Sequence, residues 1–589
     1  MYGNIKGMEN KTNISKVYNG LFLKHFVLNI TNSLCTIASG YLAGNFLDNV
    51  GMSCNSLISP LNSFVLGISL IFSSSSEILC GKYMGKGDKK SINQAFSNAV
   101  ISALVVGAAF TALLFLLSKP VVQFLGANSE MLIPSSQYLQ GYAIGVIAYM
   151  LLPIFTTFLH MENESRYATY SVVLLAGSYV ALGYLFIVIL DWGYFGFGLT
   201  TAASNILVIL FLLIKIVLNK NQVALELKTL STKCLKELII LGMPTGASRA
   251  LVGTRNLILN NILLSTGGVV AMASKSVQGS ILSVADAFTA SLVQATIVLA
   301  SVCIGEKNKK ELLNLLKHVF IKVFLVMYAM IAVYMIFPGQ ICSIFTSDPE
   351  CLEISKIATR LYMPSIILES AANILFTMFN VFGYSKFVNA NTFTHGFLIH
   401  VLFAYFTMNF LGPYSVFAGY IVCEAITILI IFVFICIKLK RLPKKVTDLL
   451  LLPESIDQGI KINRTVKTYE ETMNLSREIF DFCKENNLSK KACTTVPVCI
   501  EEMTVNIFEH GYTKKKVKDK RVDVFVSIED EEVNVRIRDN SVPFNPNTRN
   551  TIFNPEDPCK NIGIRMISKL AKEMSYQNLF GFNNTIIKM

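Results

Sequence analysis

The sequence predicts a multi-span α-helical membrane protein, with about twelve transmembrane helices in two homologous six-helix lobes, followed by a small α+β domain. Three observations predict this fold class. Hydrophobic residues make up 52% of the chain and charged residues only 15%, whereas average soluble proteins carry roughly 25% charged residues. Loops of the first lobe recur in the second at a fixed spacing. From about Lys438 the long apolar runs give way to a tail rich in Lys, Glu and Asp.

The internal repeat relates positions that lie 220 residues apart (305 less 85). The loop GKGDKK begins at Gly85 and the loop GEKNKK begins at Gly305. Two further pairs keep the same spacing: Glu130 with Glu350, and Tyr142 with Tyr362. A period of this length is far too long for a solenoid. It indicates two homologous lobes, an arrangement found in many secondary transporters.

Hydropathy divides the membrane part into apolar segments, each long enough to cross roughly 30 Å of hydrocarbon as a helix. The expected spans are 21–44, 55–80, 93–118, 136–158, 168–190, 195–218, 236–265, 269–303, 314–337, 357–382, 387–411 and 414–437. Pro153, Pro244 and Pro364 are expected to bend their spans. The expected divisions are an N-terminal segment 1–20, an N-lobe 21–220, a C-lobe 221–438, a basic linker 439–463 and a soluble domain 464–589.

The charged loops predict the topology. Lys and Arg collect in the loops after even-numbered spans, and the other loops carry almost none. This asymmetry predicts that both termini lie in the cytoplasm, and we expect the bacterial cytoplasmic membrane as the location. The same bias accounts for the formal net charge of +13 without a nucleic-acid partner. The thirteen cysteines are scattered, which predicts neither a disulfide framework nor a zinc site.

Several motifs of the membrane part recur in order. They are the two loops of the repeat, LGANSE with FTSDPE, ILGMP at 240–244 and WGYFGFGLTTAASN at 192–205. Through these motifs, residues 15–440 resemble the MATE family of multidrug and toxin extrusion transporters. The resemblance implies an antiporter that exchanges amphipathic, often cationic, small molecules for Na⁺ or H⁺ by alternating access. It also implies contact with membrane lipid and, because both lobes lie in one chain, a monomer.

Three carboxylates lie within expected spans of the second lobe: Asp286, Glu369 and Glu424. An intramembrane acid is costly unless it faces a cavity or a partner, so each is a candidate for ion coupling or substrate binding. The alternative is a hydrogen-bonded contact between helices, which we favour for Glu424 because it lies in the last span. Many MATE members carry an acid in the first span, near the position of Ser39, and this chain has none there.

The tail alternates between helix and strand patterns. Helices are expected at 473–487, 490–512 and 561–577, and strands at 522–530, 532–540 and 583–589. Three pieces carry a second resemblance: EEMTVNIFEHGY, RIRDNSVPFNP and NIGIRMI. They resemble the GHKL nucleotide-binding fold, and most closely the bacterial anti-sigma serine kinases.

The GHKL resemblance implies a role for four residues. Glu502 and Asn506 lie four apart on one helix face. Glu502 would act catalytically on the attacking hydroxyl or water, and Asn506 would hold Mg²⁺, which fits a carboxylate base and a hard amide ligand. Asp539 would accept from the adenine amino group of ATP, and Gly563 would lie beside phosphate at a helix start.

Two positions depart from the GHKL pattern. Ser541 and Asn561 stand where the family usually has glycine, and such positions tend to need backbone freedom or close approach of a ligand. These departures favour nucleotide binding over phosphotransfer. No Walker A sequence is present, so we do not expect a primary ATP pump.

The sequence thus favours a secondary antiporter whose cytosolic nucleotide-binding tail regulates it, with a regulatory protein as a further partner of the tail. Two alternatives remain. One is a membrane sensor whose tail is an anti-sigma-type kinase or binds a partner protein. The other is a flippase for a lipid-linked precursor, which a strongly cationic central cavity would favour over an acidic one.

Overall fold

The computed structural model describes residues 3–84, 89–161, 164–218, 225–226, 228, 230–305, 308–452, 460–512, 520–529, 532–545, 562–579 and 582–589. The chain divides into two compact units, Met1–Pro453 and Glu454–Met589, and each is described by itself. The loop residues 85–88 and 306–307 of the repeat, and Asn561 of the tail, lie outside the described residues.

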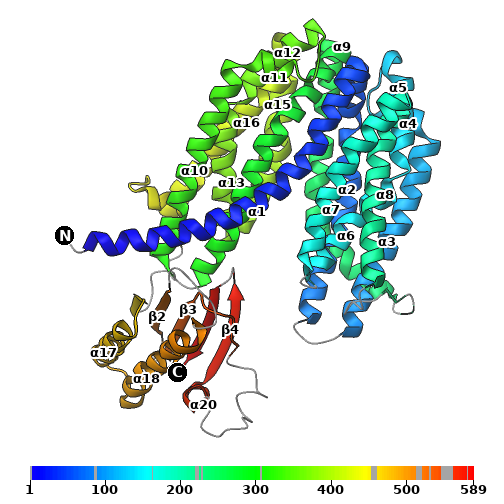
Figure 1. Cartoon of the computed structure of the whole chain (residues 1–589). Coiled ribbons are helices and arrows are strands. Elements are labelled where there is room, and N and C mark those ends of the chain that lie inside the picture. Colours follow the sequence, from blue (N-terminus) through cyan, green and yellow to red (C-terminus); the bar gives the residue numbers. More distant parts are fainter. Residues whose placement is uncertain are drawn as a thin grey trace. The chain divides into compact units, whose positions relative to one another are not determined.

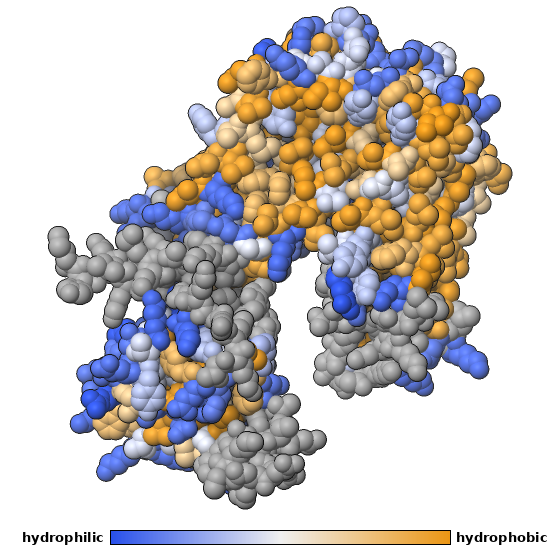
Figure 2. Space-filling model, in the orientation of Figure 1, coloured by the Kyte–Doolittle hydropathy of each residue, from blue (hydrophilic) through white to orange (hydrophobic). Residues whose placement is uncertain are grey.

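The first unit is helical throughout its described residues (Figure 1). Its elements are α1 (Gly3–Phe46), α2 (Asp48–Met84), α3 (Lys89–Leu116), α4 (Ser118–Phe124), α5 (Ser129–Ala143), α6 (Val146–Met161), α7 (Ser165–Gly183), η1 (Tyr184–Ile189), α8 (Gly193–Leu218), α9 (Thr232–Gly305), α10 (Lys309–Ile336), α11 (Pro338–Cys342), α12 (Pro349–Tyr362), α13 (Ser365–Val381), α14 (Ser385–Phe393), η3 (Thr394–Leu398), α15 (Ile399–Leu411), α16 (Tyr414–Leu439) and η4 (Val446–Leu450). Apolar residues cover the flanks of this unit (Figure 2). Exposed apolar side chains such as Phe410, which is 88% exposed, are what lipid contact requires.

The number of spans agrees with the hydropathy prediction. Among the described residues, nine helices are long and apolar enough to cross a membrane, and two bent pairs bring the number to eleven. One of the nine, α9, runs for 74 residues, or about 110 Å at 1.5 Å per residue. Gly268, with a φ of 60°, divides it into two helices. Counting both gives the twelve predicted spans, and the division falls where a short loop was expected.

The structure confirms the repeat. Helices of the two lobes begin at positions 220 residues apart: α3 and α10 at Lys89 and Lys309, α4 and α11 at Ser118 and Pro338, α5 and α12 at Ser129 and Pro349, α7 and α14 at Ser165 and Ser385. The helix caps repeat as well. Asn128 accepts a hydrogen bond from the Met131 amide, and Asp348 accepts one from the Cys351 amide, so each satisfies a free N–H of the first turn.

The fourth span of each lobe is bent at an equivalent place. Helices α5 and α6 meet at 46°, and α12 and α13 at 43°. Pro364 caps α13 at the second bend, as predicted. Pro153 lies inside α6, which continues past it as one helix, so a bend at Pro153 stays a prediction. Gly145 lies at the first bend instead, where a Cβ would overlap Ala202 of α8; close helix packing therefore accompanies this bend.

The two lobes meet through α1, α2 and α9. The Ser33 hydroxyl on α1 donates to the Ser283 carbonyl at 2.7 Å, and the Ser280 hydroxyl on α9 donates to the Thr36 carbonyl at 3.2 Å. A Cβ on Gly40 would overlap Ser280. The contact therefore depends on small residues that let two backbones approach closely.

Helix α2 makes the equivalent contact with the first half of α9. A Cβ on Gly242 would overlap the backbone of Ile71, and one on Gly246 would overlap the Ile71 side chain. The Asn260 amide donates to the Ser56 carbonyl at 2.7 Å. The membrane unit is hollowed between its lobes toward the end at which α2 stops and α3 begins (Figure 2).

The segment that follows α16 forms a turn over 441–448. Asp448 accepts from the Arg441 guanidinium at 2.8 Å and from the Lys444 amide at 2.9 Å. These hydrogen bonds lower the pKa of Asp448 to about 2. The basic start of the expected linker is therefore a fixed turn.

In the second unit, five strands among the described residues form one antiparallel sheet in the order β1-β2-β3-β5-β4. The elements are β1 (Ile460–Val466), α17 (Tyr469–Glu485), α18 (Lys490–Asn506), η6 (Ile507–Gly511), β2 (Val522–Glu529), β3 (Glu532–Asp539), α20 (Ile562–Leu570), β4 (Glu573–Leu579) and β5 (Phe582–Lys588). Its core joins helix residues such as Ile479 and Ile500 to strand residues such as Val524 and Val535.

Two expectations for this unit were wrong. The helix expected over 561–577 ends at Leu570, and β4 follows it. Ile564 and Ile567, three residues apart on α20, are buried, and this helical pattern does not continue beyond Leu570. The backbone of β4 pairs with β5 in a hairpin. The expected linker also ran too far, because residues 460–463 belong to β1, which pairs with β2.

Replacing Gly198 with alanine should destabilise the N-lobe by about 1–3 kcal/mol, as overpacking does. The added methyl would overlap the Tyr138 carbonyl oxygen on α5. Thermal unfolding of the purified protein in detergent measures the effect. The matched control is Gly177→Ala in α7, where a Cβ meets no atom within 4 Å. Equal melting temperatures for the two variants would contradict the close packing of α5 and α8.

Candidate functional sites

The structure brings Glu502 and Gly563 together in the second unit. Glu502 and Asn506 are half-buried on the last turns of α18. A Cβ on Gly563, in the first turn of α20, would overlap the Glu502 carboxylate. Because only glycine leaves room there, the backbone of α20 approaches the carboxylate directly. The arrangement places an acid, an amide and a helix start on neighbouring elements, as a nucleotide site with Mg²⁺ would need.

Asp539 lies at the end of β3 and is buried. Its Oδ1 accepts from the Ser541 amide and from the Asn583 side-chain amide, both at 2.8 Å. The Tyr576 hydroxyl in turn donates to Asn583 Oδ1 at 2.7 Å. In this structure the carboxylate therefore organises the turn after β3, and its role toward adenine stays a prediction. Sequence reasoning missed Asn583, because nothing local links it to Asp539.

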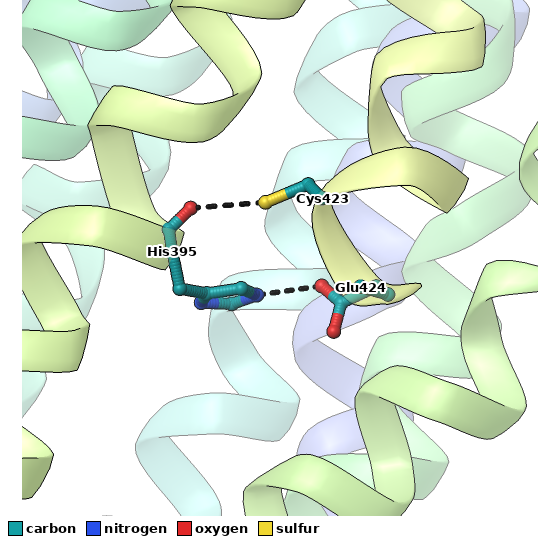
Figure 3. Close-up of side chains that lie close together, drawn as sticks. All are labelled: His395, Cys423 and Glu424. Carbon is teal, nitrogen blue, oxygen red and sulfur yellow. Dashed lines mark hydrogen bonds and ion pairs between the residues drawn. The ribbon is translucent and has the colours of Figure 1, made fainter. Parts of the chain in front are cut away.

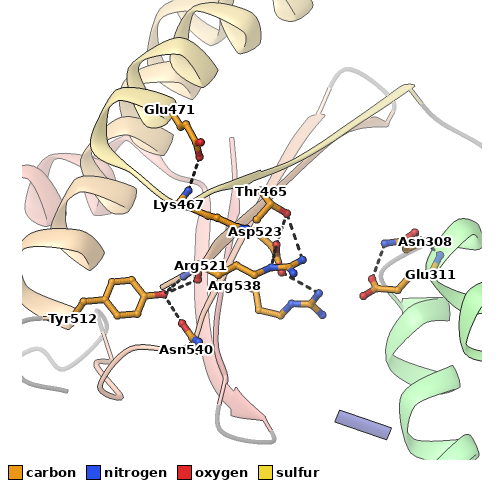
Figure 4. Close-up of polar contacts among 10 residues, drawn as sticks. All are labelled: Asn308, Glu311, Thr465, Lys467, Glu471, Tyr512, Arg521, Asp523, Arg538 and Asn540. Atoms are coloured by element: carbon orange, nitrogen blue, oxygen red, sulfur yellow. Dashed lines mark hydrogen bonds and ion pairs between the residues drawn. The ribbon is translucent and has the colours of Figure 1, made fainter. Parts of the chain in front are cut away.

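A buried network fixes the segments that flank this region (Figure 4). The Tyr512 hydroxyl accepts from the Arg521 amide at 2.9 Å and lies 2.6 Å from the Arg521 carbonyl and 2.5 Å from Asn540 Oδ1. Burial raises the pKa of Tyr512 to about 12, so the hydroxyl keeps its proton at neutral pH. Arg521 also pairs with Asp523 at 2.7 Å, where Thr465 of β1 donates to the same carboxylate.

The three predicted carboxylates of the membrane unit lie on α9, α13 and α16. Asp286 is exposed although Ala285 and Ala287 beside it are buried. Glu369 is half-buried and accepts from the Tyr362 hydroxyl at 3.1 Å, across the bend between α12 and α13. Glu424 is 6% exposed. The three helices pack on one another within the C-lobe, and we call these three carboxylates the acidic group.

Two cations in the same lobe were missed by the sequence analysis. Lys275 donates to Asn260 Oδ1 at 2.6 Å. Among the described residues, the buried Arg255 Nε has no hydrogen-bond partner. Both lie on α9, inside the expected seventh and eighth spans. The signal was present, because a basic residue within a span is as costly as an acid.

His395 was also missed. Its Nε2 lies 2.6 Å from Glu424 Oε1, and Cys423 donates to the His395 carbonyl at 3.3 Å (Figure 3). The hydrogen-bonded helix contact that we favoured for Glu424 agrees with this pairing. His395 lies in the π-helical turn η3, which redirects side chains in a way that hydropathy does not reveal.

The first unit is a two-lobed helical bundle with charged groups inside one lobe, which is typical of a membrane transporter. The second unit is a sheet domain with a Glu–Asn pair on one helix, which is typical of an ATPase-like domain. The family model MatE matches residues 26–185 and 244–406, once in each lobe. Together these matches cover more than half of the chain, which therefore belongs to the MatE family. The model of the histidine kinase-like ATPase domain matches residues 466–589.

Relatives and solved structures agree with this assignment. The multidrug export protein MepA of Staphylococcus saprophyticus is 22% identical over 377 residues, which are 62% of this chain and 81% of the relative. The probable multidrug resistance protein NorM of Thermotoga maritima is 25% identical over 288 residues, 47% of this chain and 61% of that protein.

Two solved structures share the fold of the membrane unit. An inward-facing conformation of a multidrug resistance MATE family transporter has a TM-score of 0.62 at 17% identity, over 72% of this chain and 98% of that one. A MOP superfamily transporter from Pyrococcus furiosus, whose binding pocket is described as having reverse polarity, has a TM-score of 0.56 at 19% identity, over 71% and 94%.

Replacing Tyr512 with phenylalanine should destabilise the second unit by about 1–3 kcal/mol, because buried partners of the hydroxyl lose their hydrogen bonds. Hydrogen exchange of the full chain, read in β2 and β3, measures the effect. Tyr469→Phe is the control, since Tyr469 is 53% exposed and should change nothing. Equal protection in both variants would show that the network around Tyr512 does not hold the domain.

Proposed function

We propose that the chain exports amphipathic, cationic small molecules in exchange for Na⁺ or H⁺, and that its tail regulates this transport by binding ATP with Mg²⁺. The observation that carries the transport proposal is the acidic group in the C-lobe. Asp286 and Glu369 supply carboxylates on two helices of that lobe, whereas the N-lobe carries its acids near span ends, at Asp48, Glu77 and Asp191 among others. Membership of the MatE family and the names of the relatives, a multidrug export protein and a probable multidrug resistance protein, support export of small molecules.

Coupling would use Asp286 and Glu369 as alternating carriers of the ion. Glu369 lies seven residues after Tyr362, which holds it across a bend of 43°. A change of bend would therefore change the surroundings of the carboxylate. A proton or Na⁺ on the acidic group lowers its negative charge, and a cationic substrate then binds less well. Competition of this kind is what an antiporter needs.

The charges inside the C-lobe also allow a second function. Of the charged residues described above, three are acidic (Asp286, Glu369 and Glu424) and two are basic (Arg255 and Lys275). This excess of negative charge favours a cationic substrate. The buried Arg255 Nε, without a partner among the described residues, instead favours an anionic group such as the head of a lipid-linked precursor. A flippase is therefore the alternative function.

The tail proposal rests on the Glu502–Gly563 contact and on the family match of residues 466–589. Asn506 would hold Mg²⁺, Gly563 would leave room for phosphate, and Asp539 would face the adenine. Both termini would lie in the cytoplasm of a bacterial cell, where ATP and a regulatory protein partner are available. The working unit would be a monomer in the cytoplasmic membrane.

Removing the coupling acids should abolish gradient-driven export. Purified protein in liposomes, loaded with a fluorescent cationic dye under an imposed Na⁺ or H⁺ gradient, gives the rate. We expect Asp286→Asn and Glu369→Gln each to lower it at least about tenfold, because a neutral amide cannot exchange charge with the ion. Glu77→Gln, near a span end, is the control and should export normally. Dye efflux that survives both substitutions would contradict coupling in the C-lobe.

Nucleotide binding should depend on Asn506. Equilibrium binding of a fluorescent ATP analogue with Mg²⁺ to the full chain should weaken at least about tenfold in Asn506→Ala, since the variant loses a ligand of the metal. Asn474→Ala, at an exposed position on α17, is the matched control. Equal affinities for the two variants, or wild-type binding that needs no Mg²⁺, would remove Asn506 from the site.

A further inference from the structure

Three metal-binding side chains converge inside the C-lobe. His395, Cys423 and Glu424 each offer one ligand atom, and these atoms lie within 4.8 Å of one another. His395 comes from η3, whereas Cys423 and Glu424 are neighbours on α16 (Figure 3). Cys423 is 3% and Glu424 6% exposed, and the His395 side chain is 24% exposed. The cluster is thus buried on one side and accessible through the imidazole.

The protein leaves polar atoms of this cluster unsatisfied. Glu424 Oε1 is bound by His395, but Glu424 Oε2 is buried and has no hydrogen-bond partner among the described residues. Thr427 Oγ1, one turn further along α16, is also buried without a partner there. A buried orphan carboxylate oxygen is costly, and a bound cation would satisfy it.

The donor set selects the kind of cation. Imidazole nitrogen, thiolate sulfur and carboxylate oxygen together suit Zn²⁺ and similar borderline-soft divalent ions, and do not suit Na⁺ or Mg²⁺. Charge agrees with this choice. A thiolate and a carboxylate carry two negative charges and a neutral imidazole none, so a divalent ion makes the site neutral. Neutrality matters within a span, because an uncompensated charge there is expensive.

We propose that His395, Cys423 and Glu424 bind a divalent transition-metal ion of the zinc class. On binding, the Cys423 thiol loses its proton to solvent, and the sulfur, one imidazole nitrogen and the Glu424 carboxylate coordinate the ion. Three protein ligands leave a fourth position open. The ion would join η3 of the eleventh span to α16 of the twelfth, and so restrain two helices of the lobe that holds Asp286 and Glu369.

Spacing alone does not reveal this site. The ligands lie 28 and 29 residues apart, outside the short spacings of zinc motifs. The three side chains meet only because the fold places η3 beside α16.

The test uses the full chain in detergent, stripped of metal with a chelator and then titrated with Co²⁺ and Zn²⁺. Co²⁺ reports sulfur ligation by a thiolate-to-metal charge-transfer band, and a fluorescent zinc chelator competes for Zn²⁺. We expect the wild type to show the band, Cys423→Ser to lose it, and His395→Gln and Glu424→Gln to weaken Zn²⁺ binding at least about tenfold. Neither measurement needs a gradient or a substrate, so failure here is distinguishable from failure of the transport proposal.

Cys436→Ser is the matched control, because Cys436 lies on the same helix outside the cluster and should leave the band unchanged. Among the described residues, no thiol of the tail lies in a group of three such ligands. A band that persists in Cys423→Ser, or a wild type that takes up no more metal than Cys423→Ser, would overturn the proposal. Cys423→Ser replaces only the sulfur atom by oxygen and should leave the fold intact. This variant therefore tests the metal site even if Glu424→Gln unfolds the protein.

Discussion

The close contact of the two lobes through small residues is the interaction on which the rest of the membrane unit depends. Lipid tails are as apolar as a leucine side chain, so helices in a membrane gain little from the hydrophobic effect and associate by packing and hydrogen bonds. Here serine hydroxyls of α1 and α9 bind carbonyls of the facing helix, and Gly40 and Gly242 remove the side chains that would separate the backbones. The repeat makes the contact twice, because Gly40 of α1 meets Ser280 in the second half of α9 and Ile71 of α2 meets Gly242 in the first.

The two lobes share their backbone arrangement but differ in the charged side chains inside their spans. Helix starts, caps and bends recur at one spacing, and even the residues with positive φ that divide the paired spans, Asp48 and Gly268, correspond. The charges inside the spans do not recur. The bend of the fourth span has Tyr142 in one lobe and Tyr362 in the other, yet Glu369 stands beside only the second. In the proposed antiport, alternating access would need the shared backbone and ion binding would need only one lobe, so duplication would leave the second set of side chains free to diverge.

Most of the fold could be predicted from the sequence, because span length, the repeat and charge asymmetry follow from the solvent that the chain meets. The site was harder. An acidic residue within an apolar run is easy to recognise in a sequence, and this identified Asp286, Glu369 and Glu424. The roles of Arg255, His395 and Asn583 follow only from contacts with residues distant in the sequence. The π-helical turns η3 and η6, which hold His395 and follow Asn506, have no sequence signature, although such turns are frequent at functional sites.

Ser541, in the turn after β3, stands where the GHKL pattern usually has glycine. Glycine at position 541 could serve backbone freedom or close approach of a ligand. Ser541 is not among the described residues with positive φ, and its amide binds Asp539 as the turn requires. Its side chain takes the space that a Cβ at Gly511 would occupy. The fold therefore accommodates Ser541 without positive φ, because Gly511 leaves room for its side chain. If the tail binds ATP as proposed, the serine would act by narrowing the space beside the nucleotide.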